Sequence, residues 1–266
     1  MKLHMNYLSL ALVTAFVIFS SCIAFKQNEK PALYLILIGD STVKCGKGKG
    51  EGGLWGWGSF IGNFFDSNKI NVENNALGGT SSRTFQTNGL WDAVLSKIKK
   101  GDFVMMQFGH NDGSALDDTA RARGTIKGIG IESKEIYNPI KKKQEVVYTY
   151  GWYMRKFIRD IKAKGATAIV CSPIPRNPVN NGVIKLVDDN YATWAEEVAK
   201  AEKIDFITLN KMIKDKYAVL SAEQINNFFT EKDHTHTNEV GAKFNAASVV
   251  EGLKKLKNNK LKSYLK

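Results

Sequence analysis

Two short polar blocks, one toward each end of the chain, contain the residue types that acyl-transfer chemistry requires. Residues 39–41 read Gly-Asp-Ser and end on Ser41, while residues 233–236 read Asp-His-Thr-His. A serine hydroxyl is a poor nucleophile at neutral pH unless an imidazole accepts its proton and a carboxylate orients that imidazole. The two blocks therefore predict a serine hydrolase site whose parts lie far apart in the sequence.

The small number of histidines limits where a base for Ser41 can come from. The chain contains only His4, His110, His234 and His236. His4 lies in an N-terminal segment that we expect to be removed. The base must therefore come from the Gly-His-Asn-Asp block around His110 or from the C-terminal pair.

The N-terminus has the pattern of a targeting segment, with Lys2 followed by an apolar run over residues 8–24. At about 17 residues this run is shorter than the roughly 20 that a spanning helix needs, so a signal peptide over residues 1–24 is favoured over an uncleaved anchor. Residues 19–22 resemble a lipoprotein box that would put a lipid anchor on Cys22, and cleavage after Ala24 is the alternative. We expect an exported protein, either a periplasmic or cell-surface lipoprotein or a secreted one.

The remaining residues, 25–266, are enough for a single domain with a sizeable core. Cys45 and Cys171 do not suffice for a disulfide framework. The net charge of +12 favours an acidic polymer as partner, although a solvated lysine-rich surface explains the basic tail, 254–266, equally well. Because no nucleic-acid-binding motif accompanies this charge, we expect no nucleic-acid partner, and we expect a monomer without a cofactor.

Short apolar runs alternate with longer amphipathic ones, which is typical of βα units around a parallel sheet. The apolar character of the runs is nearly continuous, as expected when helices cover both faces of the sheet. We therefore predict a three-layer α/β/α sandwich with a five-stranded parallel sheet. Residues 113–143 lack a sustained period and predict a long loop of the kind that is often functional. The expected strands are 32–38, 70–74, 102–108, 167–171 and 205–209, and the expected buried helical faces are Tyr153, Phe157, Ile158 and Ile161, and Val240, Phe244, Ala247 and Val250.

Three polar blocks come directly after the first three expected strands. Residues 39–41 follow the first strand, the glycine-rich block 78–83 follows the second, and 109–112 follow the third. Because ligands of open α/β sheets bind outside the carboxyl ends of the strands, these blocks are expected to meet at one site.

The blocks have the order and spacing of the SGNH, or GDSL-type, hydrolase superfamily, which the chain resembles over essentially all of residues 25–266. The resemblance implies a flavodoxin-like α/β fold with Ser41 as nucleophile, His236 as base and Asp233 as the group that orients the base. It also implies an oxyanion hole made by the backbone N–H groups of Ser41 and Gly79 and by the side-chain amide of Asn111.

Within that superfamily the chain more closely resembles the rhamnogalacturonan acetylesterases, which implies removal of O-acetyl groups from plant cell-wall pectin. Thr80 departs from that family, which often has arginine at this place. Alternatives are an esterase of the same fold acting on acetylxylan or a small acyl ester, and a non-catalytic glycan-binding protein. The segments that carry the closer resemblance are 81–85, 107–112, 172–177 and 233–237.

The chemistry of acyl transfer is consistent with these roles, but the oxyanion donor and the base each have an alternative. Negative charge develops on the carbonyl oxygen during acyl transfer, so the site needs preorganised donors. Gly78 is the alternative to Gly79 as donor, and His234 is the alternative to His236 as base. A His-x-His metal site formed by these two histidines lacks an apparent third ligand, so no metal is expected.

Recognition of an acidic polymer would require cations near the site. Arg83 lies in the second polar block, and Arg121 and Arg123 lie in the long connection after Asn111. Arginine pairs with carboxylates in a bidentate manner, so these three residues are the candidates for binding galacturonate.

Overall fold

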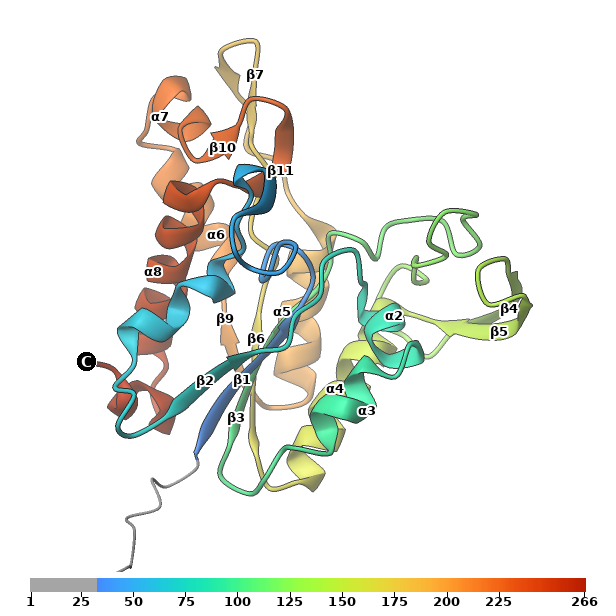
Figure 1. Cartoon of the computed structure of the whole chain (residues 1–266). Helices are drawn as coiled ribbons and strands as arrows, with labels where there is room; N and C mark the ends of the chain where they lie inside the picture. The colour runs from blue at the N-terminus through green and yellow to red at the C-terminus, as the bar shows by residue number, and fades with distance from the viewer. Residues whose placement is uncertain (1–32) are drawn as a thin grey trace, which may run out of the picture. The chain divides into compact units, whose positions relative to one another are not determined.

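The computed structural model describes residues 33–266, which form one compact unit around a parallel five-stranded sheet (Figure 1). The strand order is β2-β1-β3-β6-β9, and every neighbouring pair is parallel. Each strand falls on or within one of the predicted apolar runs, except that β1 extends one residue further, to Gly39. The predicted signal peptide and Cys22 lie outside the described residues. The strands are β1 (Tyr34–Gly39), β2 (Asn71–Asn74), β3 (Phe103–Gln107), β6 (Thr167–Cys171) and β9 (Asp205–Ile207).

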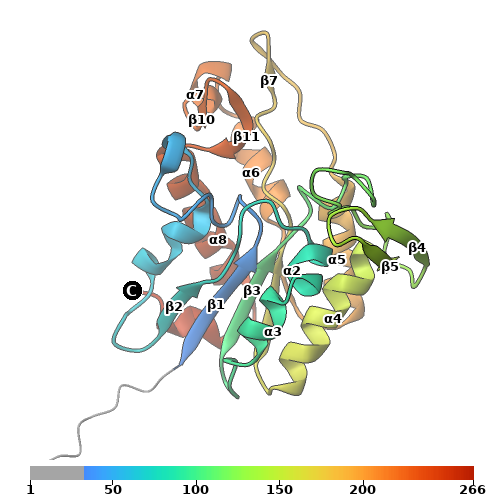
Figure 2. The same cartoon turned by 45° about the vertical axis from the view of Figure 1, so that its right-hand side comes forward.

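Helices cover both faces of this sheet, as Figures 1 and 2 show, and the fold is the predicted three-layer α/β/α sandwich. Among the described residues, none of the helices combines the length and apolar character needed to cross a bilayer. The α-helices are α2 (Ser82–Thr87), α3 (Leu90–Leu95), α4 (Tyr150–Ala163), α5 (Asn190–Ala201), α6 (Leu209–Tyr217), α7 (Ala222–Asn226) and α8 (Glu239–Lys255), and the 3₁₀ turns are η1 (Glu51–Gly53), η2 (Trp57–Ser59), η3 (Ile61–Phe64) and η4 (Lys260–Tyr264).

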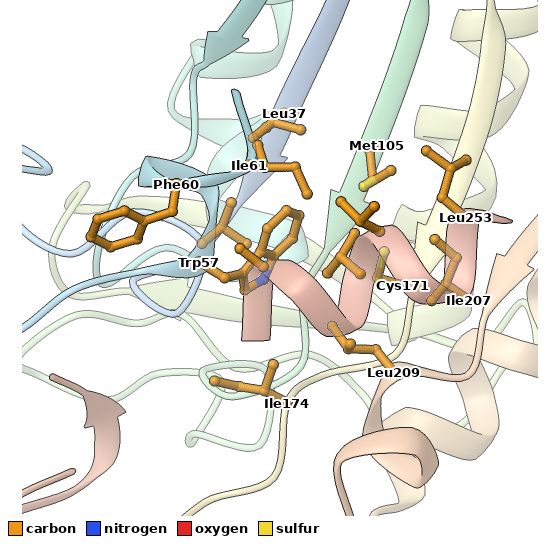
Figure 3. Close-up of a cluster of buried hydrophobic side chains, with 14 of the residues drawn as sticks. Leu37, Trp57, Phe60, Ile61, Met105, Cys171, Ile174, Ile207, Leu209 and Leu253 are labelled. Atoms are coloured by element: carbon orange, nitrogen blue, oxygen red, sulfur yellow. The ribbon is translucent and has the colours of Figure 1, made fainter. Parts of the chain in front are cut away.

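Alternate side chains of the central strands supply two separate cores, because successive residues of a strand point to opposite faces. Ile36 and Ile38 of β1 pack with α3, α4 and α5 on one face. Leu35 and Leu37 pack on the other face with η2, α6 and α8. Figure 3 shows part of this second core, with Trp57 beside α8 and Leu37 next to Ile61. The loops at the carboxyl edge of the sheet therefore extend from strands that are packed on both faces.

The predicted face of α4 is confirmed, because Tyr153, Phe157, Ile158 and Ile161 are all buried.

The predicted face of α8 is wrong in part. Val240 is 59% exposed and Ala247 is also exposed, whereas Ala242 and Ala246 are fully buried. The helix lies so close to the sheet that a Cβ on Gly252 would come within 2.4 Å of a methyl carbon of Ile207. The buried face combines the predicted Val250 with small residues, and the small ones do not stand out in a search for large apolar residues.

Three antiparallel hairpins form small two-stranded sheets of their own, separate from the central sheet. The predicted loop 113–143 is not structureless, since it contains β4 and leads into β5. A second hairpin follows β6 and projects beyond the carboxyl edge of the sheet (Figure 1). The third brings the C-terminal polar block back to that edge. The hairpins are β4 (Ser133–Asn138) with β5 (Lys143–Tyr148), β7 (Val179–Asn180) with β8 (Val183–Ile184), and β10 (Phe229–Thr230) with β11 (Asp233–Thr237).

Candidate active site

Ser41, His236 and Asp233 form a continuous hydrogen-bonded chain at the carboxyl edge of the sheet. Ser41 lies in the turn directly after β1, and its Oγ is 2.7 Å from Nε2 of His236. The other ring nitrogen of His236, Nδ1, is 2.7 Å from Oδ2 of Asp233. A ring nitrogen facing a carboxylate carries the hydrogen, so Nε2 has a lone pair directed at the serine hydroxyl. This arrangement can remove the proton from Ser41 as its oxygen attacks a carbonyl carbon.

The position of β11 is set by contacts with the loop that follows Ser41. The backbone N–H of Trp55 donates to the carbonyl of Thr237 over 2.8 Å, and the hydroxyl of Thr237 donates back to the carbonyl of Trp55. Thr237 is the residue after His236, so these bonds hold the imidazole against the nucleophile turn. They join segments that are far apart in the sequence.

The carboxylate of Asp233 is fixed by its own backbone. Its Oδ1 accepts the N–H groups of Thr235 and His236, each over 2.8 Å, which leaves Oδ2 for the imidazole. Partial burial by itself would raise the pKa of Asp233, but these amides and the ring of His236 outweigh it and hold the pKa below the usual value. The side chain is therefore ionised at neutral pH and can stabilise an imidazolium.

Asn111 keeps one side-chain amide hydrogen free. Its Nδ2 donates one hydrogen to the carbonyl of Thr80 over 2.7 Å, which orients the carboxamide and leaves the second N–H available. Within residues 33–266, the backbone N–H groups of Ser41 and Gly79 donate no hydrogen bond, and neither does that of Gly78. These groups can serve a developing oxyanion, and Gly78 stays an alternative to Gly79.

Glycine is favoured at position 79 because its φ is +82°, in the left-handed region that other residues rarely adopt. A Cβ there would lie 2.8 Å from Nη1 of Arg121, but this is the end of an exposed, flexible side chain that can move away.

A buried polar network beneath Ser41 was not predicted from the sequence. Asp40 is fully buried, and its Oδ1 accepts the backbone N–H and the hydroxyl of Thr42. The hydroxyl of Thr42 in turn accepts from Gln107, whose Oε1 accepts the indole N–H of Trp57 over 3.0 Å. These bonds tie the nucleophile turn to β3 and η2. Gln107 lies in a block that the sequence singled out, whereas nothing local marks Trp57 as its partner.

A second buried carboxylate joins the two oxyanion blocks. Asp112, next to Asn111, accepts the backbone N–H of Ser82 over 3.1 Å and its hydroxyl over 2.5 Å. Burial, helped by the nearby charge of Asp40, outweighs the bonds from Ser82 and raises the pKa of Asp112 to about 7. The loops carrying Gly79 and Asn111 are therefore held together through a titratable group.

The other two described histidines lie outside the hydrogen-bonded chain. Nε2 of His110 donates to the carbonyl of Ile174 over 3.0 Å, and the side chain is buried in its loop. His234 is exposed. Within the part of the chain that the structure describes, no three side chains of metal-ligating type are grouped, so the His-x-His alternative gains no support.

The structure contradicts one of the three predicted substrate contacts. Arg83 is fully buried, with its Nε 2.8 Å from Glu145 Oε1 and its Nη1 donating to the carbonyls of Leu116 and Gly124. A guanidinium enclosed in this way cannot reach a polymer. It anchors the 113–143 segment to α2.

Arg121 and Arg123 lie beside the candidate oxyanion hole. Arg121 is exposed with its guanidinium against Gly79, and Arg123 Nη1 donates to the carbonyl of Gly79 over 3.1 Å.

Comparison with known proteins agrees with the geometry. The family model described as GDSL-like Lipase/Acylhydrolase matches residues 35–249. A rhamnogalacturonan acetylesterase of Emericella nidulans is 30% identical over 209 residues, which are 78% of this chain and 79% of that protein. A probable rhamnogalacturonan acetylesterase of Bacillus subtilis, YesY, is 29% identical over 85% of this chain and 94% of its own length.

Solved structures of this fold include the YXIM protein of Bacillus subtilis, with a TM-score of 0.66 and 27% identity over 84% of this chain. The matched part is only 56% of that longer protein. The acetylxylan esterase Axe2 of Geobacillus stearothermophilus superposes with a TM-score of 0.56 at 17% identity, covering 84% of this chain and 96% of its own, and this likeness concerns the fold alone. Since one family model spans most of the chain, the protein belongs to the GDSL-like lipase/acylhydrolase family.

Proposed function

We propose that this carbohydrate acetylesterase removes O-acetyl groups from an acidic plant cell-wall pectin, rhamnogalacturonan, with Ser41, His236 and Asp233 as its catalytic triad. The observation that carries the proposal is the pair of 2.7 Å contacts on the two sides of the His236 ring. They supply a base for the nucleophile and an orienting group for the base in a single geometry.

In the proposed first step, Ser41 Oγ attacks the acetyl carbonyl carbon and His236 Nε2 takes the hydroxyl proton. Negative charge moves to the carbonyl oxygen, where the N–H groups of Ser41 and Gly79 and the amide of Asn111 stabilise it. When this intermediate collapses, the bond to the sugar oxygen breaks and the sugar hydroxyl leaves with the proton from His236. The acetyl group stays on Ser41.

In the second step a water molecule replaces the sugar. His236 takes one proton from the water as its oxygen attacks the acetyl carbonyl carbon, and it returns that proton to Ser41 Oγ when acetate is released. The net reaction consumes one water and yields the free sugar hydroxyl and acetic acid, and the residues described here supply every proton transfer.

The choice of an acidic substrate has support from charge and from the relatives. The chain carries 38 basic against 26 acidic residues. One of its relatives is named a rhamnogalacturonan acetylesterase and another a probable rhamnogalacturonan acetylesterase. Arg121 and Arg123, next to Gly79, are proposed to contact the polymer. For such a substrate outside the cell, residues 1–24 would act as an export signal.

Release of acetate from acetylated rhamnogalacturonan, acetylated xylan and acetylated homogalacturonan, measured side by side, tests the proposal. The expected result is the highest kcat/KM on rhamnogalacturonan. Preference for xylan would support the acetylxylan alternative instead. Binding of the glycan without any acetate release would support the non-catalytic alternative, which the complete set of Ser41, Asn111, Asp233 and His236 argues against because binding alone needs no triad.

A further inference from the structure

A cleft of about 860 Å³ lies next to the candidate catalytic residues and has no role in the chemistry described above. Its lining begins at Gly109 and His110, immediately before Asn111, and continues across Ser114 and Arg123 to the segment 174–191. Ser41, His236 and Asp233 are not part of the lining. The volume is far larger than an acetyl group requires and is typical of a site for a whole ligand, at roughly 300–1,000 Å³.

The lining of this cleft is strongly cationic. It contains five basic and two acidic side chains, and both acids already have partners. Asp188 Oδ1 accepts from Lys214 over 3.2 Å, and Asp189 accepts the N–H of Tyr191 at the start of α5. None of the other four cations forms an ion pair with a carboxylate in residues 33–266. The cations without such a pair are Arg123, Lys127, Arg176 and Lys185.

The two arginines of this set, Arg123 and Arg176, lie between the cleft and the catalytic residues. Arg176 donates to the hydroxyl of Thr235, in the loop of the candidate base, and over 3.4 Å to the carbonyl of His110. Arg123 bonds to the carbonyl of Gly79 and, over 3.2 Å, to the hydroxyl of Ser114. Each guanidinium is held by neutral oxygens only, so its charge is available to an anion close to the acyl site.

Two apolar side chains form a small apolar wall of the cleft, between polar and charged neighbours in the segment after the β7–β8 hairpin, which projects beyond the sheet in Figure 1. Val187 is 61% exposed and Leu186 38% exposed, and both line the cleft. Trp194 lies on the α5 side with its ring 4.9 Å from that of Tyr191. Exposed apolar side chains that border a cleft are a common sign of a binding surface.

We propose that this cleft is a glycan subsite in which Arg176 and Arg123 bind the carboxylate of a uronic acid unit next to the acetylated sugar. The apolar wall of Leu186 and Val187 receives the methyl group of the neighbouring 6-deoxyhexose. This inference rests on the proposed function, because rhamnogalacturonan alternates a uronic acid with a 6-deoxy sugar. The polymer then runs from Ser41 toward the β7–β8 hairpin. A neutral xylan chain offers neither group.

The test uses Arg176→Gln and compares two forms of one substrate: an acetylated rhamnogalacturonan oligosaccharide, and the same oligosaccharide with its carboxylates reduced to alcohols. The readout is the ratio of kcat/KM for the acidic form to that for the reduced form, in which any general damage to catalysis cancels. We expect the ratio to fall roughly tenfold, as for loss of hydrogen bonds to a charged group. Lys185→Gln, at an exposed position of the same cleft, should lower it less.

Arg159→Gln is the matched control, because Arg159 is an exposed arginine on α4 that pairs with Glu202 and does not line the cleft. Its ratio should equal that of the wild type. An equal ratio for Arg176→Gln and Arg159→Gln would overturn the subsite.

Calorimetric binding of the deacetylated oligosaccharide separates this inference from the proposed function. Binding to the wild type that weakens in Arg176→Gln but not in Arg159→Gln supports the subsite even if acetate is released only from xylan. Absence of binding to the wild type overturns the subsite even if acetate is released from rhamnogalacturonan.

Discussion

Replacement of Asp233 by Asn probes the orientation of the base with a change of one atom. In the structure Oδ1 accepts two backbone N–H groups, from Thr235 and His236, while Oδ2 faces His236 Nδ1. An asparagine must place its carbonyl oxygen where the two amides point, because its NH₂ group cannot accept them. The NH₂ group then faces Nδ1 and moves the ring hydrogen to Nε2, which removes the lone pair that would receive the Ser41 proton.

The expected loss follows from this change of tautomer. We expect kcat/KM for an aryl acetate to fall about 10⁴-fold, or roughly 5 kcal/mol at about 1.4 kcal/mol per decade. Asp233→Ala leaves both tautomers accessible, so Asn should be no better than Ala despite its closer shape. Glu231→Gln, at an exposed position of the same loop, is the control and should leave the rate unchanged. A folded Asp233→Asn variant within about tenfold of the wild type would refute this account of the triad.

Three further predictions concern neighbouring residues. Asn111→Ala should lower kcat by roughly 10²–10³ with a smaller change in KM, because its amide binds charge that develops in the transition state; a change in KM alone would make it a substrate-positioning residue. His236→Ala should inactivate the enzyme and His234→Ala should not, and reversed phenotypes would move the base by two residues. Asp112 has a folded-state pKa of about 7, above its value in the unfolded chain, so its stabilising contribution is present at acid pH and is lost as pH rises from about 4 to 7. Asp112→Asn should therefore flatten the decrease in unfolding free energy between pH 4 and pH 7 measured by urea denaturation, and an unchanged slope would contradict the assignment.

The central sheet could be predicted because its strands are buried on both faces and their apolar runs are nearly continuous. The β4–β5 hairpin could not, because most of its residues are exposed and carry polar or charged side chains. The small residues of α8 hid its buried face for a related reason, since Ala246 and Gly252 look neutral on a hydrophobicity pattern. How closely a hairpin or a helix packs against the rest of the fold depends on residues that are distant in the sequence, so a local hydrophobicity pattern does not reveal it.

The candidate site shows the same division. Ser41 stands in a block whose residue types indicate its chemistry, whereas the roles of Asn111 and His236 were predicted from the resemblance to a known superfamily. Arg83 looks like an exposed cation in the sequence, and its partner Glu145 lies 62 residues away. Arg176 lies in the segment 172–177, which carries part of the family resemblance. Its proposed role in binding depends on the fold, which places it between Thr235 and the cleft.

Covalent attack by Ser41 is the step on which the proposed function depends most directly. Treatment with a fluorophosphonate, which traps activated serines, followed by peptide mass spectrometry, measures this step without reference to any glycan. The account predicts one adduct per chain on Ser41, with labelling abolished in Ser41→Ala and in His236→Ala but retained in His234→Ala. An active, folded enzyme that takes no label, or that is labelled at a different serine, would contradict it.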